Sequence, residues 1–243
     1  MKYLVTFSDG KLFNDVEKLM HSTQNVLGVD EHFAYRKQHM WNDKEFVEKN
    51  YHLIRVKHGC GMYIWKPYII NDALKKINDG DYLLYFDCSR HYPTGFTESS
   101  NGIIKYMENN NIEMTGGMID TINNYYHVSP VCVNIIKHDN NFNSNEFYKT
   151  PHYMATHIII RKTEKTIRCI QDWLKYCQIK DCICPPPRKD GRHNYDMSVF
   201  NVVMYIYGFK GIDVNDGKHI CKDHNYLLKH FNVMYNNINN THD

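Results

Sequence analysis

Hydrophobic and polar positions along this chain follow two periods, which predict short buried strands alternating with amphipathic helices. Strands are expected, most clearly in the uninterrupted apolar run at 82–86, at 2–7, 29–35, 82–86 and 152–162. Between them, apolar residues recur at the spacing of helices that pack one face on a sheet, over 12–20, 67–78, 101–109, 163–177 and 196–208. This order predicts the α/β class, with a mixed, mostly parallel central sheet flanked by helices.

Other segments have weaker patterns. A short helix is expected at 43–49, and alternating residues predict a strand at 52–57. A strand at 112–114 is expected to lead into a tight turn at 115–118, because two glycines occur there. The polar, Asn-rich segment 137–150 has no periodicity and is expected to be a loop, and 209–214 is expected to be a last strand. Because no long linker divides the chain, residues 1–243 are expected to form one domain.

The stretch 59–90 combines a glycine turn, a helix and the most apolar strand. Pro67 suits the first turn of a helix, where its missing N–H would be unpaired anyway, and Lys66 then lies at a helix N-terminus, where phosphate is favoured. The strand 82–86 delivers Asp87 to its carboxyl end, at the sheet edge where ligands of open α/β folds bind. A carboxylate there is a natural ligand for a divalent cation that carries a phosphate. We therefore expect Asp87 to bind a divalent cation and Lys66 to contact a phosphate group.

Composition excludes some classes of function. The net charge of +2 gives no basic field that would predict nucleic-acid binding, and no stretch approaches the ~20 apolar residues of a membrane span. With no export signal visible, a cytoplasmic protein with 8 reduced cysteines is expected. Cys177, Cys182, Cys184 and His193 lie close enough in the sequence to suggest zinc, but their spacing fits no standard finger.

The run GMYIWKPYIINDALKKINDGDYLLYFDCS at 61–89 resembles the central block of GT-A-type, nucleotide-sugar-dependent glycosyltransferases. These include bacterial capsular-polysaccharide enzymes and enzymes of large DNA viruses such as chlorella viruses. Further resemblance lies at 3–8 and 153–200. The family's Asp-x-Asp metal motif is Asp87-Cys88-Ser89 here, so a hydroxyl replaces the second carboxylate. The resemblance implies a GT-A-like domain with a nucleotide-binding half at about 1–90 and an acceptor and sugar half at about 91–243, located in the cytoplasm (the host cytoplasm for a viral protein).

The resemblance also implies roles for individual residues. The donor nucleotide is expected to contact Thr6, Phe7, Ser8, Tyr63, Lys66, Phe86, Asp87 and Cys88. The expected metal is Mn²⁺ or Mg²⁺ on the donor diphosphate, which Lys66 is also expected to contact. Its expected ligands are Asp87, Ser89 and a late histidine, His224, with His219 as an alternative. Asp196 is the expected catalytic carboxylate, because Tyr195-Asp196-Met197-Ser198 resembles the family's His-Asp-Gln-Ser, and His157 is expected to contact the sugar or the acceptor.

The activity implied is the transfer of a hexose or pentose from a nucleoside diphosphate sugar, most simply a UDP-sugar, to a hydroxyl of a glycan or glycoprotein. The resemblance favours retention of the anomeric configuration. Two alternatives stay open. A sugar nucleotidyltransferase also places carboxylates at strand ends, but its Gly-rich phosphate loop is absent, since 8–10 is too short. A nucleotide-sugar-binding protein without catalysis would explain the degenerate Asp87-Cys88-Ser89 motif.

Overall fold

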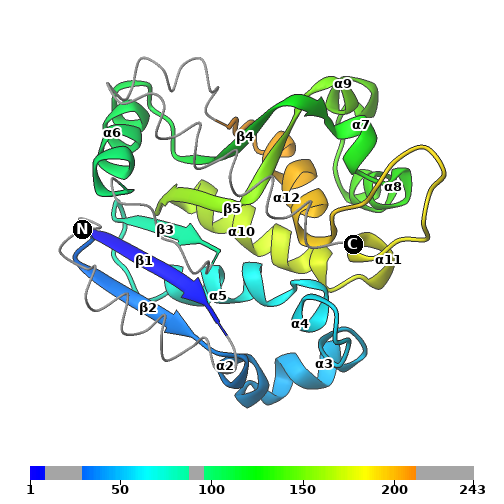
Figure 1. Cartoon of the computed structure of the whole chain (residues 1–243), viewed down its shortest axis with the longest axis horizontal. Coiled ribbons are helices and arrows are strands. Elements are labelled where there is room, and N and C mark those ends of the chain that lie inside the picture. Colours follow the sequence, from blue (N-terminus) through cyan, green and yellow to red (C-terminus); the bar gives the residue numbers. More distant parts are fainter. Residues whose placement is uncertain (9–28, 88–95, 212–243) are drawn as a thin grey trace.

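The computed structural model describes residues 1–8, 29–87 and 96–211 of the chain, and only the backbone of 96–100 and 117–122. These ranges form one open, five-stranded sheet flanked by helices (Figure 1). The α/β class predicted from the sequence is therefore confirmed. The strands are β1 (Lys2–Phe7), β2 (Glu31–Tyr35), β3 (Tyr82–Phe86), β4 (Met114–Asn123) and β5 (Pro151–Arg161).

The sheet has the strand order β2-β1-β3-β5-β4 and contains both kinds of pairing. β1 runs parallel to β2 and to β3, whereas β5 runs antiparallel to both β3 and β4. Because β1 and β3 are parallel neighbours, with Val5 opposite Tyr85, their carboxyl ends meet at one edge of the sheet. This edge is where ligands bind in open α/β sheets.

Helices cover both faces of the sheet. The larger hydrophobic cluster lies between the sheet and α5, α10 and α12, and a smaller cluster on the other face joins Leu4, Leu84 and Phe86 to Ile104 and Met107 of α6. The described helices are α2 (Lys37–Asn42), α3 (Lys44–Ile54), α4 (Gly59–Met62), α5 (Trp65–Leu74), α6 (Phe96–Asn109), α7 (Asn124–His127), α8 (Pro130–Asp139), α9 (Ser144–Lys149), α10 (Glu164–Cys177), α11 (Lys180–Ile183) and α12 (Tyr195–Ile206).

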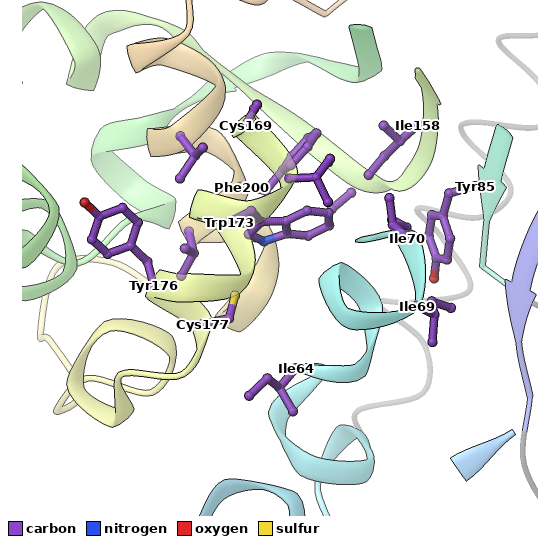
Figure 2. Packing of buried hydrophobic residues seen from close by; sticks show 14 of the residues in the cluster. Ile64, Ile69, Ile70, Tyr85, Ile158, Cys169, Trp173, Tyr176, Cys177 and Phe200 are labelled. Atoms are coloured by element: carbon purple, nitrogen blue, oxygen red, sulfur yellow. The ribbon is translucent and has the colours of Figure 1, made fainter. Parts of the chain in front are cut away.

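Trp173 of α10 lies at the centre of the larger cluster and is fully buried (Figure 2). Its ring centroid lies 4.7 Å from that of Phe200 on α12, and the indole N–H donates to the Asp196 carbonyl at 2.8 Å. Ile70 of α5 and Ile158 of β5 belong to the same cluster. One buried side chain therefore ties α10 to the start of α12.

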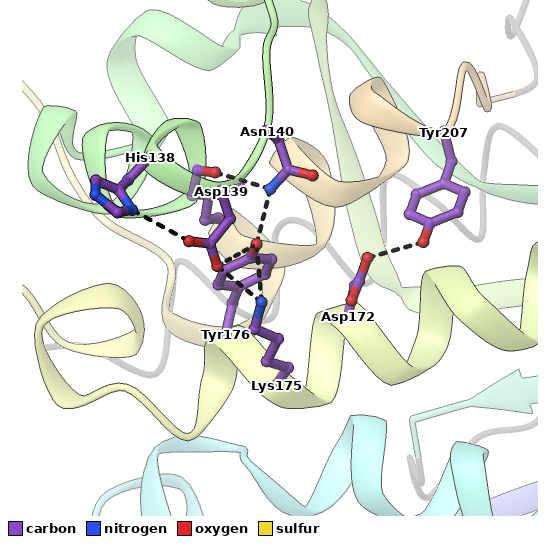
Figure 3. A network of polar contacts seen from close by, with 8 residues as sticks. His138, Asp139, Asn140, Asp172, Lys175, Tyr176 and Tyr207 are labelled. Carbon is purple, nitrogen blue, oxygen red and sulfur yellow. Dashed lines mark hydrogen bonds and ion pairs between the residues drawn. The ribbon is translucent and has the colours of Figure 1, made fainter.

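Polar contacts at the surface fix α8 against α10 (Figure 3). The Asp139 carboxylate accepts from Lys175 at 2.7 Å and from the Tyr176 hydroxyl at 3.1 Å. These hydrogen bonds, first of all that from Lys175, lower the pKa of Asp139 to about 2. Because the Lys175 and Asp139 side chains are exposed, this network adds little stability, and its main effect is to fix how α8 lies against α10.

Four predicted elements differ from the structure, one of them only in its described part. Residues 209–211 form no strand, while 212–214 and the helix predicted at 12–20 lie outside the described residues. Residues 52–57 are not a strand, because His52–Ile54 continue α3, where Phe46, Asn50, Leu53 and Ile54 are buried at helical spacing. Residues 115–118 are not a tight turn but part of β4, in which a Cβ on Gly116 would lie 3.2 Å from the Phe200 ring. Residues 137–150 are not a loop, because Asn143 caps α9 through the Asn145 and Glu146 amides and Phe147 is fully buried.

Candidate active site

The α5–β3 unit brings Lys66 and Asp87 together. α5 precedes β3 and runs back along it, so the N-terminus of the helix lies at the carboxyl end of the strand. The 10 residues of α5 span about 15 Å, and the 5 residues of β3 span about 17 Å. Because these lengths match, the second residue of the helix meets the first residue after the strand. The Lys66 ammonium lies 3.2 Å from Asp87 Oδ1.

α12 brings a second carboxylate to the same place. Asp196 lies in the first turn of this helix, which the Trp173 indole holds through the Asp196 carbonyl. Further along α12, the Asn201 side chain accepts from the Tyr153 N–H at 2.7 Å and donates to the Tyr153 carbonyl at 2.8 Å. These two bonds fix the helix to β5, and the first turn then points Asp196 at Lys66.

Lys66 joins the two carboxylates. Its ammonium lies 3.4 Å from Asp196 Oδ2 in addition to the contact with Asp87. The Lys66 and Asp196 side chains are 4% and 5% exposed, whereas that of Asp87 is 33% exposed. Asp196 Oδ2 has no hydrogen-bond partner among the described residues, so its contact with Lys66 is an ion pair without hydrogen-bond alignment. Two acidic groups thus share one buried cation, which leaves an excess of negative charge.

Burial and the shared cation set the ionisation of this group. Burial raises the pKa of Asp196 to about 6, although Lys66 opposes the shift, and the nearby Asp87 adds to it. Burial alone would lower the pKa of Lys66, but the Asp196 and Asp87 carboxylates outweigh it and hold that pKa above its ordinary value. Lys66 is therefore charged at neutral pH. The Asp196 carboxyl, in contrast, changes its charge near neutral pH.

Tyr85 fixes one oxygen of Asp87. It lies two residues earlier on β3 and therefore on the same face, and its hydroxyl donates to the Asp87 oxygen that also contacts Lys66. The Asp87 amide donates to the Thr156 carbonyl of β5 at 2.9 Å. Among the described residues nothing donates to Asp87 Oδ2. The carboxylate is thus held by one oxygen and presents the other.

The open oxygen of Asp87 suits a divalent cation that arrives with its ligand. Mg²⁺ and similar ions are commonly held by one or two carboxylates together with substrate phosphates and water. Residues 1–8, 29–87 and 96–211 contain no group of three or more His, Cys, Asp or Glu side chains that could hold a metal ion. A carboxylate with one open oxygen, such as Asp87, has the chemistry that this kind of site requires.

The turn before α5 has an unusual backbone. All four residues of α4 and the following Tyr63 have positive φ, between 50° and 97°, which makes the segment left-handed. Gly61 is suited to this conformation, and a Cβ there would lie 2.8 Å from the Ile54 backbone. Non-glycine residues in this region cost of order 1 kcal/mol or more, and such strain gathers at functional sites. The Trp65 indole donates to the Gly59 carbonyl at 2.9 Å and closes the turn beside Lys66.

The residues predicted to contact the nucleotide are divided between the two faces of the sheet. Phe7 stacks on Trp65 with ring centroids 4.0 Å apart, and both are buried. Thr6 lies on the other face and donates to the Phe86 carbonyl at 2.8 Å. The Ser8 amide donates to the Tyr35 carbonyl, while its buried hydroxyl has no partner among the described residues. Thr6 and Phe86 therefore lie beside Asp87. Phe7 contacts Trp65, the residue that precedes Lys66.

His157 lies on the other face of the sheet, although Asp87 and Lys66 are close enough to act on its pKa. It pairs with Phe86 across the β3–β5 ladder, and the two rings are 4.8 Å apart on the face opposite Tyr85 and Asp87. Burial lowers the pKa of His157 to about 4, so the ring is neutral at pH 7. The structure brings together Lys66, Asp87, Asp196 and Tyr63, and it leaves His157 with Phe86.

Some predicted residues lie outside the described ranges, namely Cys88, Ser89, His219 and His224. The cysteines that suggested zinc are described, and Cys182 Sγ lies 3.2 Å from Cys132 Sγ. His193 instead accepts from the Ser129 amide at 3.2 Å. The described cysteines are free thiols, and they lie at Cys60, Cys132, Cys169, Cys177, Cys182 and Cys184.

Sequence reasoning assigned no role to Tyr85, although a signal was present. Tyr85 and Asp87 are two residues apart at the end of a strand, which places them on one face. Two histidines next to the start of α12, His127 and His152, were also missed. The His127 and His152 rings stack at 4.8 Å, and the Asn194 amide nitrogen lies 2.8 Å from His127 Nδ1. No periodic pattern indicates these contacts, because they join residues from distant segments.

Comparisons with family models, with curated proteins and with solved structures find no match to this chain. No helix in the described part of the chain is long and apolar enough to cross a membrane.

Proposed function

We propose that this protein is a glycosyltransferase that moves a hexose or pentose from a nucleoside diphosphate sugar to a hydroxyl acceptor on a glycan or glycoprotein. A UDP-sugar is the favoured donor, and the proposal includes a cytoplasmic setting, metal dependence and retention of configuration. The observation that carries it is the meeting of Asp87, Lys66 and Asp196 at the carboxyl ends of β1 and β3. The resemblance at residues 61–89 adds independent support.

The proposed reaction breaks the bond between the anomeric carbon and the diphosphate oxygen, and both electrons leave with the diphosphate. The acceptor oxygen forms the new bond, and its proton passes to the departing diphosphate. Mn²⁺ or Mg²⁺ on the open oxygen of Asp87 would supply positive charge where negative charge develops. Asp196 faces the sugar side and stabilises the positive charge that grows on the ring. Lys66 holds the two carboxylates at a fixed spacing.

Lys66 differs from its expected role as a free phosphate contact. Its ammonium is 4% exposed and already paired with two carboxylates. In the proposed mechanism it therefore acts first as a positioning residue. A direct contact with the diphosphate remains a prediction, and it requires the ammonium to turn away from one of its partners.

A thermal-shift screen of nucleoside diphosphate sugars, with and without MnCl₂, tests the proposal. A ligand present at about 100 times its Kd stabilises a protein by about 2.7 kcal/mol. We expect a manganese-dependent shift with at least one donor, followed by release of nucleoside diphosphate when acceptors are added. Asp87→Asn should abolish the manganese dependence. Asp79→Asn is the matched control, because the Asp79 side chain is 86% exposed at the other end of the α5–β3 unit.

A protein that binds nucleotide sugars without transferring them is the second candidate. It is favoured by the single open carboxylate, since Lys66 already occupies Asp87 Oδ1 and Asp196 Oδ2. Manganese-dependent donor binding without release of nucleoside diphosphate, over a broad acceptor panel, would support this candidate instead. A screen with no shift for any nucleoside diphosphate sugar would contradict both.

A further inference from the structure

Three aromatic side chains, His58, Tyr63 and Tyr195, gather beside the charged group and form what we term the aromatic cluster. The centroid distances are 4.8 Å between His58 and Tyr195, 5.7 Å between His58 and Tyr63, and 5.9 Å between Tyr63 and Tyr195. His58 is exposed and the two tyrosines are half-buried. The cluster therefore presents ring surface to solvent.

The aromatic cluster borders the two carboxylates. Tyr195 directly precedes Asp196, and the Lys66 ammonium lies 5.9 Å from the centre of the Tyr63 ring. Asp196 Oδ2 beside it is buried and has no hydrogen-bond partner among the described residues. The ring faces thus lie next to a buried carboxylate with an unused oxygen and to Asp87, whose side chain is 33% exposed.

The backbone holds the two tyrosines at some cost. Tyr63 has φ 62° and Tyr195 has φ 48°, in the left-handed region that side chains disfavour. Neither hydroxyl has a hydrogen-bond partner among the described residues, so no polar contact of the tyrosines explains the conformation. Outliers of this kind gather at ligand clamps. Here two of them, from segments distant in the sequence, meet at one spot.

Ring orientation indicates the shape of the ligand. Tyr195 is inclined at 45° to both His58 and Tyr63, and His58 and Tyr63 are perpendicular at 90°. No two rings are parallel, so the cluster offers no slot for a flat nucleobase stacked on both faces. Inclined rings suit a puckered ring that has C–H groups on its faces and hydroxyls around its edge. Those hydroxyls could donate to the neighbouring carboxylates.

We propose that His58, Tyr63 and Tyr195 form a subsite for the pyranose ring of a neutral sugar, which packs its C–H face on the tyrosines and turns hydroxyls toward Asp196. The role of this subsite in catalysis rests on the proposed function. The binding of a free sugar to the subsite does not depend on that function. The sugar has two sources with the same chemistry, the transferred sugar of the donor and the terminal sugar of the acceptor.

Saturation-transfer NMR with methyl α- and β-glucopyranoside and galactopyranoside, together with titrations of UDP and of UDP-glucose in MnCl₂, tests the subsite. We expect Tyr195→Ala and His58→Ala each to weaken at least one sugar-bearing ligand by about fivefold or more, with UDP unchanged. Tyr195→Phe should keep binding, because it retains the ring. Tyr51→Ala is the control, since it removes a ring that is 52% exposed outside the cluster. Circular dichroism and melting curves establish that each variant is folded.

The outcomes separate the sources of the sugar. A loss confined to UDP-glucose places the donor sugar on the cluster, a loss confined to methyl glycosides places the acceptor sugar there, and either supports the subsite. An equal loss for UDP and UDP-glucose would show that the cluster holds the base or the diphosphate, and would overturn the inference. Unchanged binding of every sugar in folded Tyr195→Ala and His58→Ala would also overturn it. Sugar binding through the cluster without binding of any nucleoside diphosphate sugar would leave the subsite standing and remove the proposed function.

Discussion

The ammonium of Lys66 lies 3.4 Å from Asp196 Oδ2, and the two side chains are only 4% and 5% exposed. Removing two charges from water costs several kcal/mol per ion, and the attraction between them often no more than restores that loss. The pair is therefore weak evidence of stabilisation. We interpret it as an arrangement that keeps a buried carboxylate close to its ionisation point, at the edge of the sheet where β1 and β3 end.

Lys66→Met is expected to destabilise the protein by about 3–5 kcal/mol at about pH 8, because it leaves a buried carboxylate without its cation. Urea unfolding measures the change. Lys76→Met, in the turn that follows α5, is the matched control, since Lys76 pairs with Asp72 at 2.7 Å while its side chain is 48% exposed. Exposed pairs of this kind contribute roughly 0–1 kcal/mol. Equal losses for the two variants would contradict the buried pair.

The loss in Lys66→Met should depend on pH in a defined direction. The folded pKa of Asp196, about 6, lies above the ordinary value of 3.8. The proton is therefore bound more tightly in the folded state, so this group's favourable contribution is present below about pH 4 and is lost as pH rises through about 6. Without Lys66 the pKa of Asp196 rises further, so the penalty should be smaller at about pH 5 than at about pH 8. A penalty that is constant between these values would contradict the assignment.

Gly61→Ala is expected to destabilise the protein by more than Gly80→Ala, and the difference should be about 2 kcal/mol or more. Both glycines have positive φ, 97° and 85°, so the two substitutions share the conformational cost. A Cβ at Gly61 would lie 2.8 Å from the Ile54 backbone, whereas a Cβ at Gly80 would meet nothing within 4 Å. The difference in thermal unfolding between the two variants therefore measures the cost of the clash with Ile54. Equal melting temperatures would show that the left-handed turn can move away from α3.

Much of the fold could be predicted from the sequence, because local signals agree with the tertiary structure. The apolar run 82–86 became β3, and the Thr163 cap and the apolar spacing that follows it became α10. The strand predicted at 52–57 was wrong because Ile54 and Val56 alternate with polar residues, whereas Leu53 and Ile54 continue the helical spacing from Phe46. Over so short a segment the two periods cannot be distinguished.

The candidate site was only partly accessible to the same reasoning. The position of Asp87 follows from a strand end, but the meeting of Lys66 with Asp196 depends on how α12 packs on β5 and α10. The sequence indicated that Lys66 starts a helix, but not that its ammonium points inward. A helix N-terminus predicts which backbone groups are free, whereas the direction of a side chain is decided by packing.

Tyr85→Phe is expected to leave the stability within about 1 kcal/mol, because it keeps the buried ring and removes the hydrogen bond to Asp87. That bond holds the Asp87 oxygen that also contacts Lys66. Without it the carboxylate is held by Lys66 alone and its orientation is less fixed, so the affinity for manganese with nucleoside diphosphate should fall several-fold, while the affinity for nucleoside diphosphate alone stays the same. Calorimetric titration with and without MnCl₂ measures both affinities. Tyr82→Phe is the control, since its hydroxyl lies on the other face and donates to Glu108 at 3.3 Å.

The transfer activity is expected to depend on ionised Asp196. The pKa of this carboxyl is about 6 in the folded protein. If the charged form stabilises the sugar ring in the transition state, kcat/KM should rise about tenfold per pH unit below about pH 6 and level off above it. This rise is the acidic limb of the pH profile. Lys66→Met should move the acidic limb to higher pH, because the cation that favours the charged form of Asp196 is gone. A profile that is flat between about pH 5 and pH 8 would contradict the role.

Asp196→Asn distinguishes this role from a structural one. The amide has nearly the same shape and leaves Lys66 paired with Asp87 at 3.2 Å, so the melting temperature and manganese-dependent donor binding should change little. If the carboxylate acts mainly in the transition state, its loss lowers kcat by orders of magnitude, because each ~1.4 kcal/mol added to the barrier is a factor of ten. The acidic limb of the pH profile should also disappear, an effect that a helix-stabilising residue would not produce. Asp190→Asn, in the loop before α12 with a side chain 61% exposed, is the control. Transfer by Asp196→Asn at close to the parent rate, with the acidic limb intact, would assign the catalytic charge to another group.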